Sequence, residues 1–102
     1  MKVVVTTCES KDASGIVQQL LQERLVGCGN IIDGVKSMYW WKGEIQQDSE
    51  SLIVMETPDD ICSAVLHRLA EIHPYEVPKI MALEPTDVSE AYQNWLHEET
   101  KK

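Results

Sequence analysis

Hydrophobic residues recur along the N-terminal part of the chain in one pattern typical of strands and another typical of helices. Val3-Val4-Val5 leads into two threonines, and an unbroken β-branched run of this kind predicts a buried strand. Residues 8–12 are polar and predict a turn, in which Ser10 or Asp12 is expected to cap a helix. That helix is indicated by apolar residues at helical spacing: Ile16, Val17, Leu20 and Leu21.

The middle of the chain alternates between short apolar runs and turn residues. Gly27 is expected to end the first helix as its left-handed cap. Residues 28–32 predict a second strand, which the turn signal Asp33-Gly34 closes. A long strand is expected over 35–45, and the polar residues 46–49 should turn the chain into a strand over 52–55.

A second helix and a last strand follow. Thr57 is expected to cap this helix, with Pro58 at the first helical position. A regular apolar stripe continues it: Ile61, Val65, Leu69 and Ile72. His73-Pro74 should end the helix, because a residue before proline avoids helical geometry. A loop braced by two prolines then leads to a strand over 79–83.

The C-terminal segment predicts one extra helix. Asp87 is expected to cap it, with Glu90 three residues later as the partner in a capping box. Its apolar side consists of Val88, Ala91, Tyr92, Trp95 and Leu96. The complete order predicts an α+β fold of the ferredoxin-like βαββαβ type, with a long hairpin and an additional helix, in one domain over 1–102.

Composition and charge narrow the possible partners. Seventeen acidic residues face nine basic ones, a formal net charge of −8. A phosphate backbone would be repelled by this field, so no nucleic-acid partner is expected. No stretch reaches the roughly 20 apolar residues of a membrane span. The three cysteines are widely spaced and predict reduced thiols, so the expected location is the cytoplasm.

A catalytic centre is not indicated by any group of residues. Cys8 follows the first strand, but the acidic neighbours Glu9 and Asp12 should keep its thiol protonated. An acylphosphatase would need a cationic phosphate cradle in the same loop, which is acidic and contains no arginine. An RNA-recognition domain would need exposed aromatic residues in positive surroundings. We therefore expect a protein without enzymatic activity and without a required cofactor.

Metal binding is harder to judge from spacing. The soft donors form no pair at the spacing of a structural zinc site; they are Cys8, Cys28, Cys62, His67, His73 and His97. His73 precedes a rigid loop that could hold it for a ligand, although capping the helix C-terminus is an equal alternative. Cys28 and Cys8 are the other candidates, and Cys28 in a strand is also typical of a small core residue. Copper ligands drawn from different subunits would leave no pattern within one chain.

The consecutive aromatic residues of the long strand are the most informative feature. Tyr39, Trp40 and Trp41 place large rings on both faces of the sheet. Helices on one side can cover only one face, and the long hairpin also leaves unpaired edges. The sequence therefore predicts assembly with further copies of the chain. Lys42 and Glu44 at the end of this strand suit the rim of a cleft.

Three segments at these separations resemble the signatures of the CutA family, the divalent-cation tolerance proteins. They are Cys28-Gly-Asn-Ile-Ile32, Tyr39-Trp-Trp-Lys-Gly-Glu-Ile45 and His73-Pro-Tyr-Glu-Val-Pro78. The resemblance extends in the same order from Val3 to Leu96. It implies a tight homotrimer with an architecture like that of PII signalling proteins, and a role in tolerance of copper and other heavy metals.

The resemblance also implies candidate sites. Some members carry a cysteine where this chain has Thr7, and a second histidine where it has Ile72. The metal candidates here are His73, Cys28 and Cys8, with copper or another divalent cation as ligand. The expected trimer interface and cleft comprise Tyr39, Trp40, Trp41, Lys42, Glu44, Tyr75 and Trp95. A PII-like small-molecule sensor, or a scaffold trimer for a protein partner, is the alternative function.

Overall fold

The computed structural model of the protein describes residues 1–101. Its elements, in order, are β1 (Lys2–Cys8), α1 (Ser10–Gln22), β2 (Cys28–Trp41), β3 (Glu44–Thr57), the short 3-10 helix η1 (Asp59–Ile61), α2 (Cys62–Ile72), β4 (Ile80–Leu83) and α3 (Glu90–Glu99). The strands form one antiparallel sheet in the order β2-β3-β1-β4. This is the ferredoxin-like arrangement that the sequence predicts.

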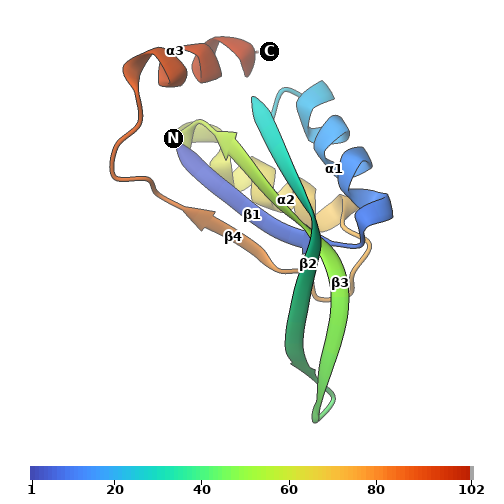
Figure 1. Ribbon diagram of the computed structural model, residues 1–102. Helices are drawn as coiled ribbons and strands as arrows, with labels where there is room; N and C mark the ends of the chain where they lie inside the picture. The colour runs from blue at the N-terminus through green and yellow to red at the C-terminus, as the bar shows by residue number, and fades with distance from the viewer. Residues whose placement is uncertain (102) are drawn as a thin grey trace.

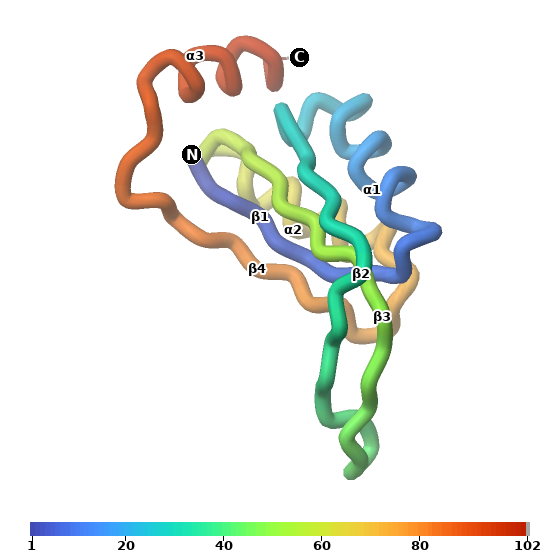
Figure 2. The backbone as a smooth tube through the Cα atoms, in the orientation of Figure 1, coloured from blue at the N-terminus to red at the C-terminus, as the bar shows by residue number. Residues whose placement is uncertain are grey.

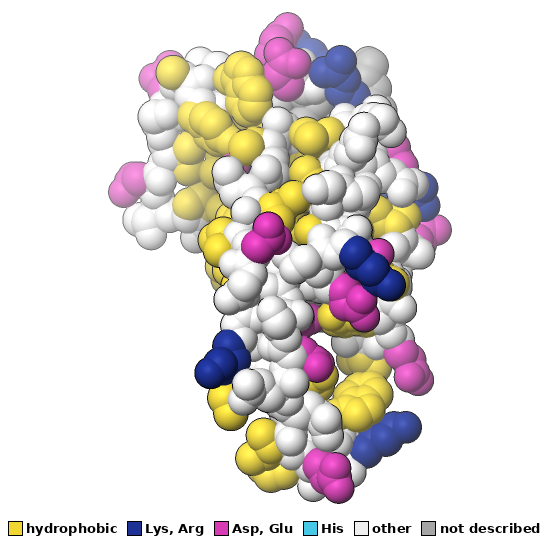
Figure 3. Space-filling view, turned by 45° about the vertical axis from the view of Figure 1, so that its right-hand side comes forward, with side chains coloured by type: hydrophobic (Ala, Val, Ile, Leu, Met, Phe, Trp, Pro, Cys, Tyr) yellow, Lys and Arg dark blue, Asp and Glu magenta, His cyan; other side chains and the backbone are white. Residues whose placement is uncertain are grey.

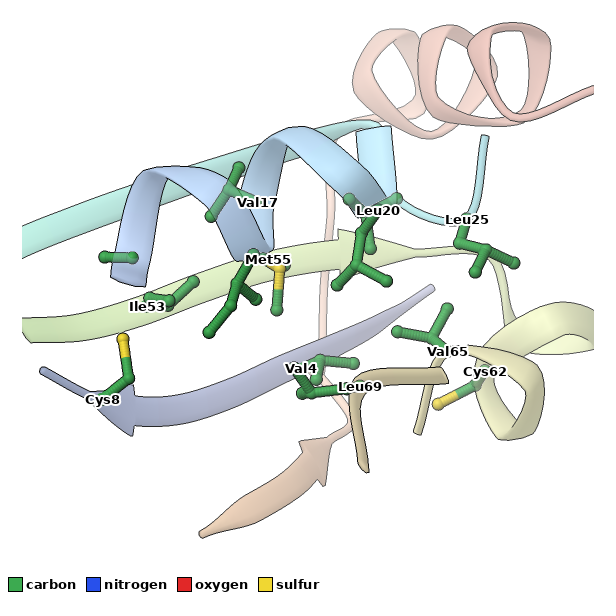
Figure 4. Packing of buried hydrophobic residues seen from close by; sticks show 13 residues of the cluster. Val4, Cys8, Val17, Leu20, Leu25, Ile53, Met55, Cys62, Val65 and Leu69 are labelled. Carbon is green, nitrogen blue, oxygen red and sulfur yellow. The ribbon is translucent and has the colours of Figure 1, made fainter. Parts of the chain in front are cut away.

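Helices α1 and α2 cover one face of the sheet, and α3 lies across one end of it (Figure 1). Alternate residues of the central strands point towards the two helices, including the buried Val4, Ile53 and Met55. They meet Leu20 of α1 and Leu69 of α2, both fully buried, in a single hydrophobic core (Figure 4). Among residues 1–101, the opposite face of the sheet carries no helix apart from α3 at its end (Figure 1).

Strands β2 and β3 are each 14 residues long and extend beyond the body of the domain. We call their projecting part, residues 35–50, the arm (Figure 2). The expected turn at Asp33-Gly34 is instead a bulge, where the pairing shifts register between Ile32 and Val35 and the strand continues. Asp33 and Gly34 oppose Ser51 alone, and one extra residue of this kind bends the strand without ending it.

The expected turn over 46–49 is wrong, because those residues pair with β2 throughout. The chain reverses at Lys42 and Gly43, whose φ angles are 51° and 80°. Two successive left-handed residues match the twist of a two-residue hairpin turn. The polar run was misleading because an arm that projects into solvent needs no apolar alternation.

The first helix also ends differently from the prediction. It closes with a Schellman motif in which Arg24, at φ 60°, is the left-handed residue, and Leu25 N–H donates to Leu20 O over 3.0 Å. Gly27 lies three residues further on and has another role. A β-carbon there would come within 2.5 Å of Leu96 Cδ1, so the glycine allows α3 to approach the sheet.

The remaining predicted caps are also corrected. Glu9 occupies the N-cap position of α1, while Ser10 is the first residue of the helix and its Oγ lies 2.9 Å from Ser51 Oγ. Thr57 ends β3, and its hydroxyl donates to Leu25 O over 2.8 Å. Ser89, and not Asp87, caps α3 by accepting from Tyr92 N–H. The end of α2 before Pro74 is confirmed.

Candidate functional site

His73 is held by hydrogen bonds at both ring nitrogens. Its Nε2 lies 2.9 Å from Thr7 O, and its Nδ1 accepts from Tyr75 N–H over 3.1 Å. Because a carbonyl can only accept, the ring proton lies on Nε2. Nδ1 carries no proton because it accepts from Tyr75 N–H, so the ring is in its neutral form. The side chain is only 6% exposed. A metal ion could therefore bind His73 only after displacing one of these partners.

Tyr75 continues this network to the base of the arm. Its ring lies 4.8 Å from that of His73, and its hydroxyl donates to Glu50 Oε2 over 2.6 Å. Burial and the neighbouring Glu50 carboxylate both raise the pKa of Tyr75 above its usual value. Glu50 itself is buried, and the tyrosine supplies a charge-assisted hydrogen bond for it.

Cys8 lies at the end of β1 with its side chain fully buried in the core. Burial, together with the negative charges of Asp12, Glu50 and Glu9, raises the pKa of its thiol to about 11. The thiolate is the reactive and metal-binding form, so a raised pKa disfavours Cys8 both as a nucleophile and as a metal ligand at neutral pH.

Cys28 has different surroundings, on the face of the sheet that α1 and α2 leave open. It is half-buried, pairs in register with Glu56, and its Sγ lies 4.0 Å from Asn30 Oδ1. The hydroxyl of Tyr92 donates to Glu56 Oε1 over 2.7 Å. Burial and the Glu56 carboxylate raise the pKa of Tyr92. A thiol, a carboxylate and an amide oxygen thus lie together on one strand pair.

The three metal candidates are not brought together within one chain. Register places Cys28 beside Glu56 and Cys8 beside Ser51, five residues away along β3, which corresponds to about 17 Å. In the part of the chain that the structure describes, residues 1–101, no three His, Cys, Asp or Glu side chains are arranged to hold a metal ion.

The arm exposes apolar side chains on both of its faces. Trp40 pairs with Ile45 on one face, and they are 71% and 61% exposed. Met38 is also exposed on that face, whereas Tyr39 and Trp41 lie on the other. The phenol of Tyr39 is bonded to Asp48. Single exposed apolar residues are common, but an apolar strip along a projecting ribbon is typical of an interaction surface.

A second apolar surface lies on the open face of the sheet. Register places four strands side by side there, with exposed Ile32, Met81 and Leu83 beside half-buried valines and leucine: Val3, Val5, Leu52 and Val54. Figure 3 shows hydrophobic side chains gathered over the body and again on the arm. We call this set of seven residues the open face.

The expected cleft residues are spread along the whole molecule. Lys42 lies at the end of the arm, with Nζ 5.9 Å from the Trp41 ring, and Glu44 follows the turn. Tyr75 lies at the base of the arm, bonded to Glu50. Trp95 lies on α3 at the other end of the domain, 5.4 Å from the Tyr92 ring. One chain alone therefore does not form the predicted cleft.

Sequence reasoning missed Glu50, Glu56, Tyr92 and Asn30, which surround the candidate side chains. A signal for the two glutamates was present in β3, where Glu50, Leu52, Val54 and Glu56 alternate with the core-facing residues. Carboxylates in phase with apolar strand positions indicate buried acids that need hydroxyl partners. The partners Tyr75 and Tyr92 come from segments far away in sequence, and nothing local identifies them.

None of the helices in residues 1–101 is long and apolar enough to cross a membrane.

Comparison with known proteins gives consistent matches over the whole chain. A family model described as CutA1 divalent ion tolerance protein matches residues 1–99. The divalent-cation tolerance protein CutA of Pyrococcus horikoshii is 40% identical over 103 residues, covering 100% of both chains. The Thermus thermophilus protein of the same name is 36% identical over 98 residues, covering 96% of this chain and 95% of the relative.

Solved structures agree with these matches. The crystal structure of CutA1 from Pyrococcus horikoshii has a TM-score of 0.94 at 39% identity and covers 100% of both chains. A structure titled as the periplasmic divalent cation tolerance protein CutA from Archaeoglobus fulgidus has a TM-score of 0.93 at 26% identity, covering 99% of this chain and 100% of the other. The chain belongs to the CutA1 divalent ion tolerance family.

Proposed function

We propose that this protein acts as a homotrimer that binds divalent cations, copper first, in the response to heavy metals, and that it has no enzymatic activity. Membership of the divalent ion tolerance family supports the metal response. The observation that carries the assembly is the pair of uncovered apolar surfaces, the arm and the open face, which a single chain leaves in water. Burying such surfaces against further copies is favourable by about 25 cal/mol per Å² of apolar area.

Cys28 is the best candidate for a metal ligand. It is the partly exposed cysteine, and Glu56 and Asn30 Oδ1 lie beside it. Thiolate and imidazole donors favour copper and zinc, and carboxylate can complete such a set. Because Cys28 lies on the same face of the sheet as the apolar surface that a second copy would cover, the remaining ligands would come from a neighbouring subunit.

Copper titration with tryptophan fluorescence tests the site, with zinc as a redox-inert second cation. Trp95 packs against Tyr92, which bonds Glu56 across from Cys28, so copper bound there should quench its emission. We expect Cys28→Ala to abolish saturable quenching, while Cys62→Ala, a matched change at a buried position of α2, keeps it. Equal quenching in both variants would rule out Cys28 as a ligand.

The second candidate is a sensor of a small molecule bound between subunits. Its support is the position of Trp41, Lys42 and Glu44 at the far end of the arm, from which they can reach Tyr75 only in another copy. A thermal-shift screen with nucleotides and anions tests it, because a ligand of the native state raises the melting temperature. A shift with such compounds and none with metals would favour the sensor, and none with either would favour a scaffold.

We propose the cytoplasm as the location, in line with three free cysteines.

A further inference from the structure

The arm leaves the body at its base, so the contacts there bear on the direction in which it projects. At the bulge between Ile32 and Val35 the strands leave the four-stranded sheet and continue as a two-stranded ribbon. A ribbon of this kind twists strongly and is marginally stable by itself. Contacts at the base must therefore determine where the arm points.

One side of the base is tied to the body by a chain of hydrogen bonds that is buried at His73 and half-buried at Tyr75. Thr7 O in β1 lies 2.9 Å from His73 Nε2, and His73 Nδ1 accepts from Tyr75 N–H over 3.1 Å. The hydroxyl of Tyr75 then donates to Glu50 over 2.6 Å. Glu50 pairs with Val35, and these two residues form the first pair of the arm beyond the bulge. The chain thus runs from the centre of the sheet to the first rung of the arm.

The other side of the base is tied to helix α1. Asp33, within the bulge, accepts from Ser51 Oγ, which lies 2.9 Å from Ser10 Oγ at the start of α1. Because Glu50 and Ser51 are adjacent and face opposite sides of β3, the strand is held from both sides at one level. Rotation of the arm about its base would break at least one of these connections.

We propose that His73 and Tyr75 are positioning residues, which fix the direction of the arm so that its apolar faces meet a second copy of the chain. This inference rests on the proposed homotrimer and deepens it. It also gives His73 a role in which both ring nitrogens are already used, so that metal binding at His73 would release the arm. Glu50 receives a partner that its burial requires.

The test uses the full chain with nitroxide labels on cysteines introduced at Gln47 in the arm and Ser63 on α2, both exposed, in a Cys28→Ser background. Labelled chains are diluted with unlabelled ones, and the distance distribution within one chain is measured by pulsed electron resonance. Sedimentation gives the dissociation constant of the assembly for each variant.

We expect Tyr75→Phe to broaden or displace the distance distribution and to weaken the assembly on the order of tenfold, as loss of a hydrogen bond to a charged group would. Glu50→Gln keeps an acceptor for the tyrosine and should retain the narrow distribution. Tyr92→Phe removes a matched tyrosine–glutamate bond at the α3 end and should leave the arm distance unchanged.

An unchanged distance and an unchanged dissociation constant in Tyr75→Phe would overturn the positioning role while the homotrimer stands. A wild-type chain that stays monomeric would remove the homotrimer instead. The distance distribution of that monomer, compared with Tyr75→Phe, would still show whether the network holds the arm.

Discussion

Gly29 lies directly beneath α1, where a β-carbon would come within 2.5 Å of Val17 Cγ1. Gly15 lies on α1 itself, and a β-carbon there would meet nothing within 4 Å. The same substitution should therefore have opposite effects at the two positions, although both glycines look equally permissive in the sequence.

We predict that Gly29→Ala lowers the free energy of unfolding by about 1–3 kcal/mol, because the core must shift to accept the methyl group. Gly15→Ala should raise it by about 0.5–1 kcal/mol, because alanine restricts the unfolded chain and favours the helix. Denaturant unfolding of both variants measures this. Similar destabilisation by both would show that the close approach at Gly29 is not the cause.

Three protons, on the buried thiol of Cys8 and on the half-buried phenols of Tyr75 and Tyr92, make the fold sensitive to alkaline pH. The pKa of Cys8 is raised to about 11, and those of Tyr75 and Tyr92 are raised as well. The folded chain keeps these protons at a pH where the unfolded chain releases them. Their stabilisation is therefore complete below the unfolded pKa values and is lost as pH rises through the folded ones.

We predict that the free energy of unfolding falls steadily as pH rises above about 9, the ordinary value for a thiol. Cys8→Ala should make this fall shallower between pH 9 and 11 without removing it, because the two tyrosines remain. Unfolding curves at a series of pH values provide the measurement. A stability that stays level up to pH 11 would contradict the buried protonated groups.

At the scale of elements, the sequence was sufficient for the strand and helix order but not for the shape of the hairpin. The core pattern of Val4, Val65 and Leu69 is strong because each faces a buried partner. The arm has no such requirement, so Gln46 to Ser49 resembled a turn while the reversal at Lys42-Gly43 resembled a bend. The left-handed conformation of Lys42 and Gly43 follows from the twist of the ribbon, which the spacing of apolar residues does not reveal.

The candidate site, like the hairpin, could be predicted from the sequence only in part. The histidine and the tyrosine of the His73–Pro78 segment could be selected from sequence, but their connection to Thr7 and Glu50 depends on segments more than 20 residues away. Spacing also could not show that Cys8 is buried and Cys28 half-buried, because the face of the sheet on which each cysteine lies depends on the register with β3.

The turn at the end of the arm should respond to substitution of its two left-handed residues. Lys42 adopts φ 51°, which asparagine tolerates better than lysine, whereas Gly43 adopts φ 80°, which favours glycine. Lys42→Asn should slow hydrogen exchange of the arm amides. Gly43→Ala should speed this exchange, because it lowers the free energy of opening the arm by about 1–2 kcal/mol. Amides of α2 are the internal control. Unchanged exchange in both variants would argue against the left-handed turn.

The whole molecule is 44 Å long, with the arm at one end and α3 at the other (Figure 1). The arm projects away from the body and does not fold back over its own open face (Figure 1), so each surface needs another chain. We predict that Trp40→Glu weakens self-association by at least tenfold while leaving the secondary structure intact, because Trp40 is 71% exposed and lies outside the core.

Leu21→Glu provides the matched control, since Leu21 is an exposed apolar residue on α1, away from both surfaces. It should leave self-association unchanged. If the two variants associate equally well, the aromatic face of the arm does not carry the assembly.

Sedimentation velocity of the unmodified chain across a wide concentration range tests the proposed homotrimer. One chain has a mass of 11.6 kDa, so we expect a single species at three times that mass that persists on dilution. A folded species that sediments as a monomer at every concentration would contradict it.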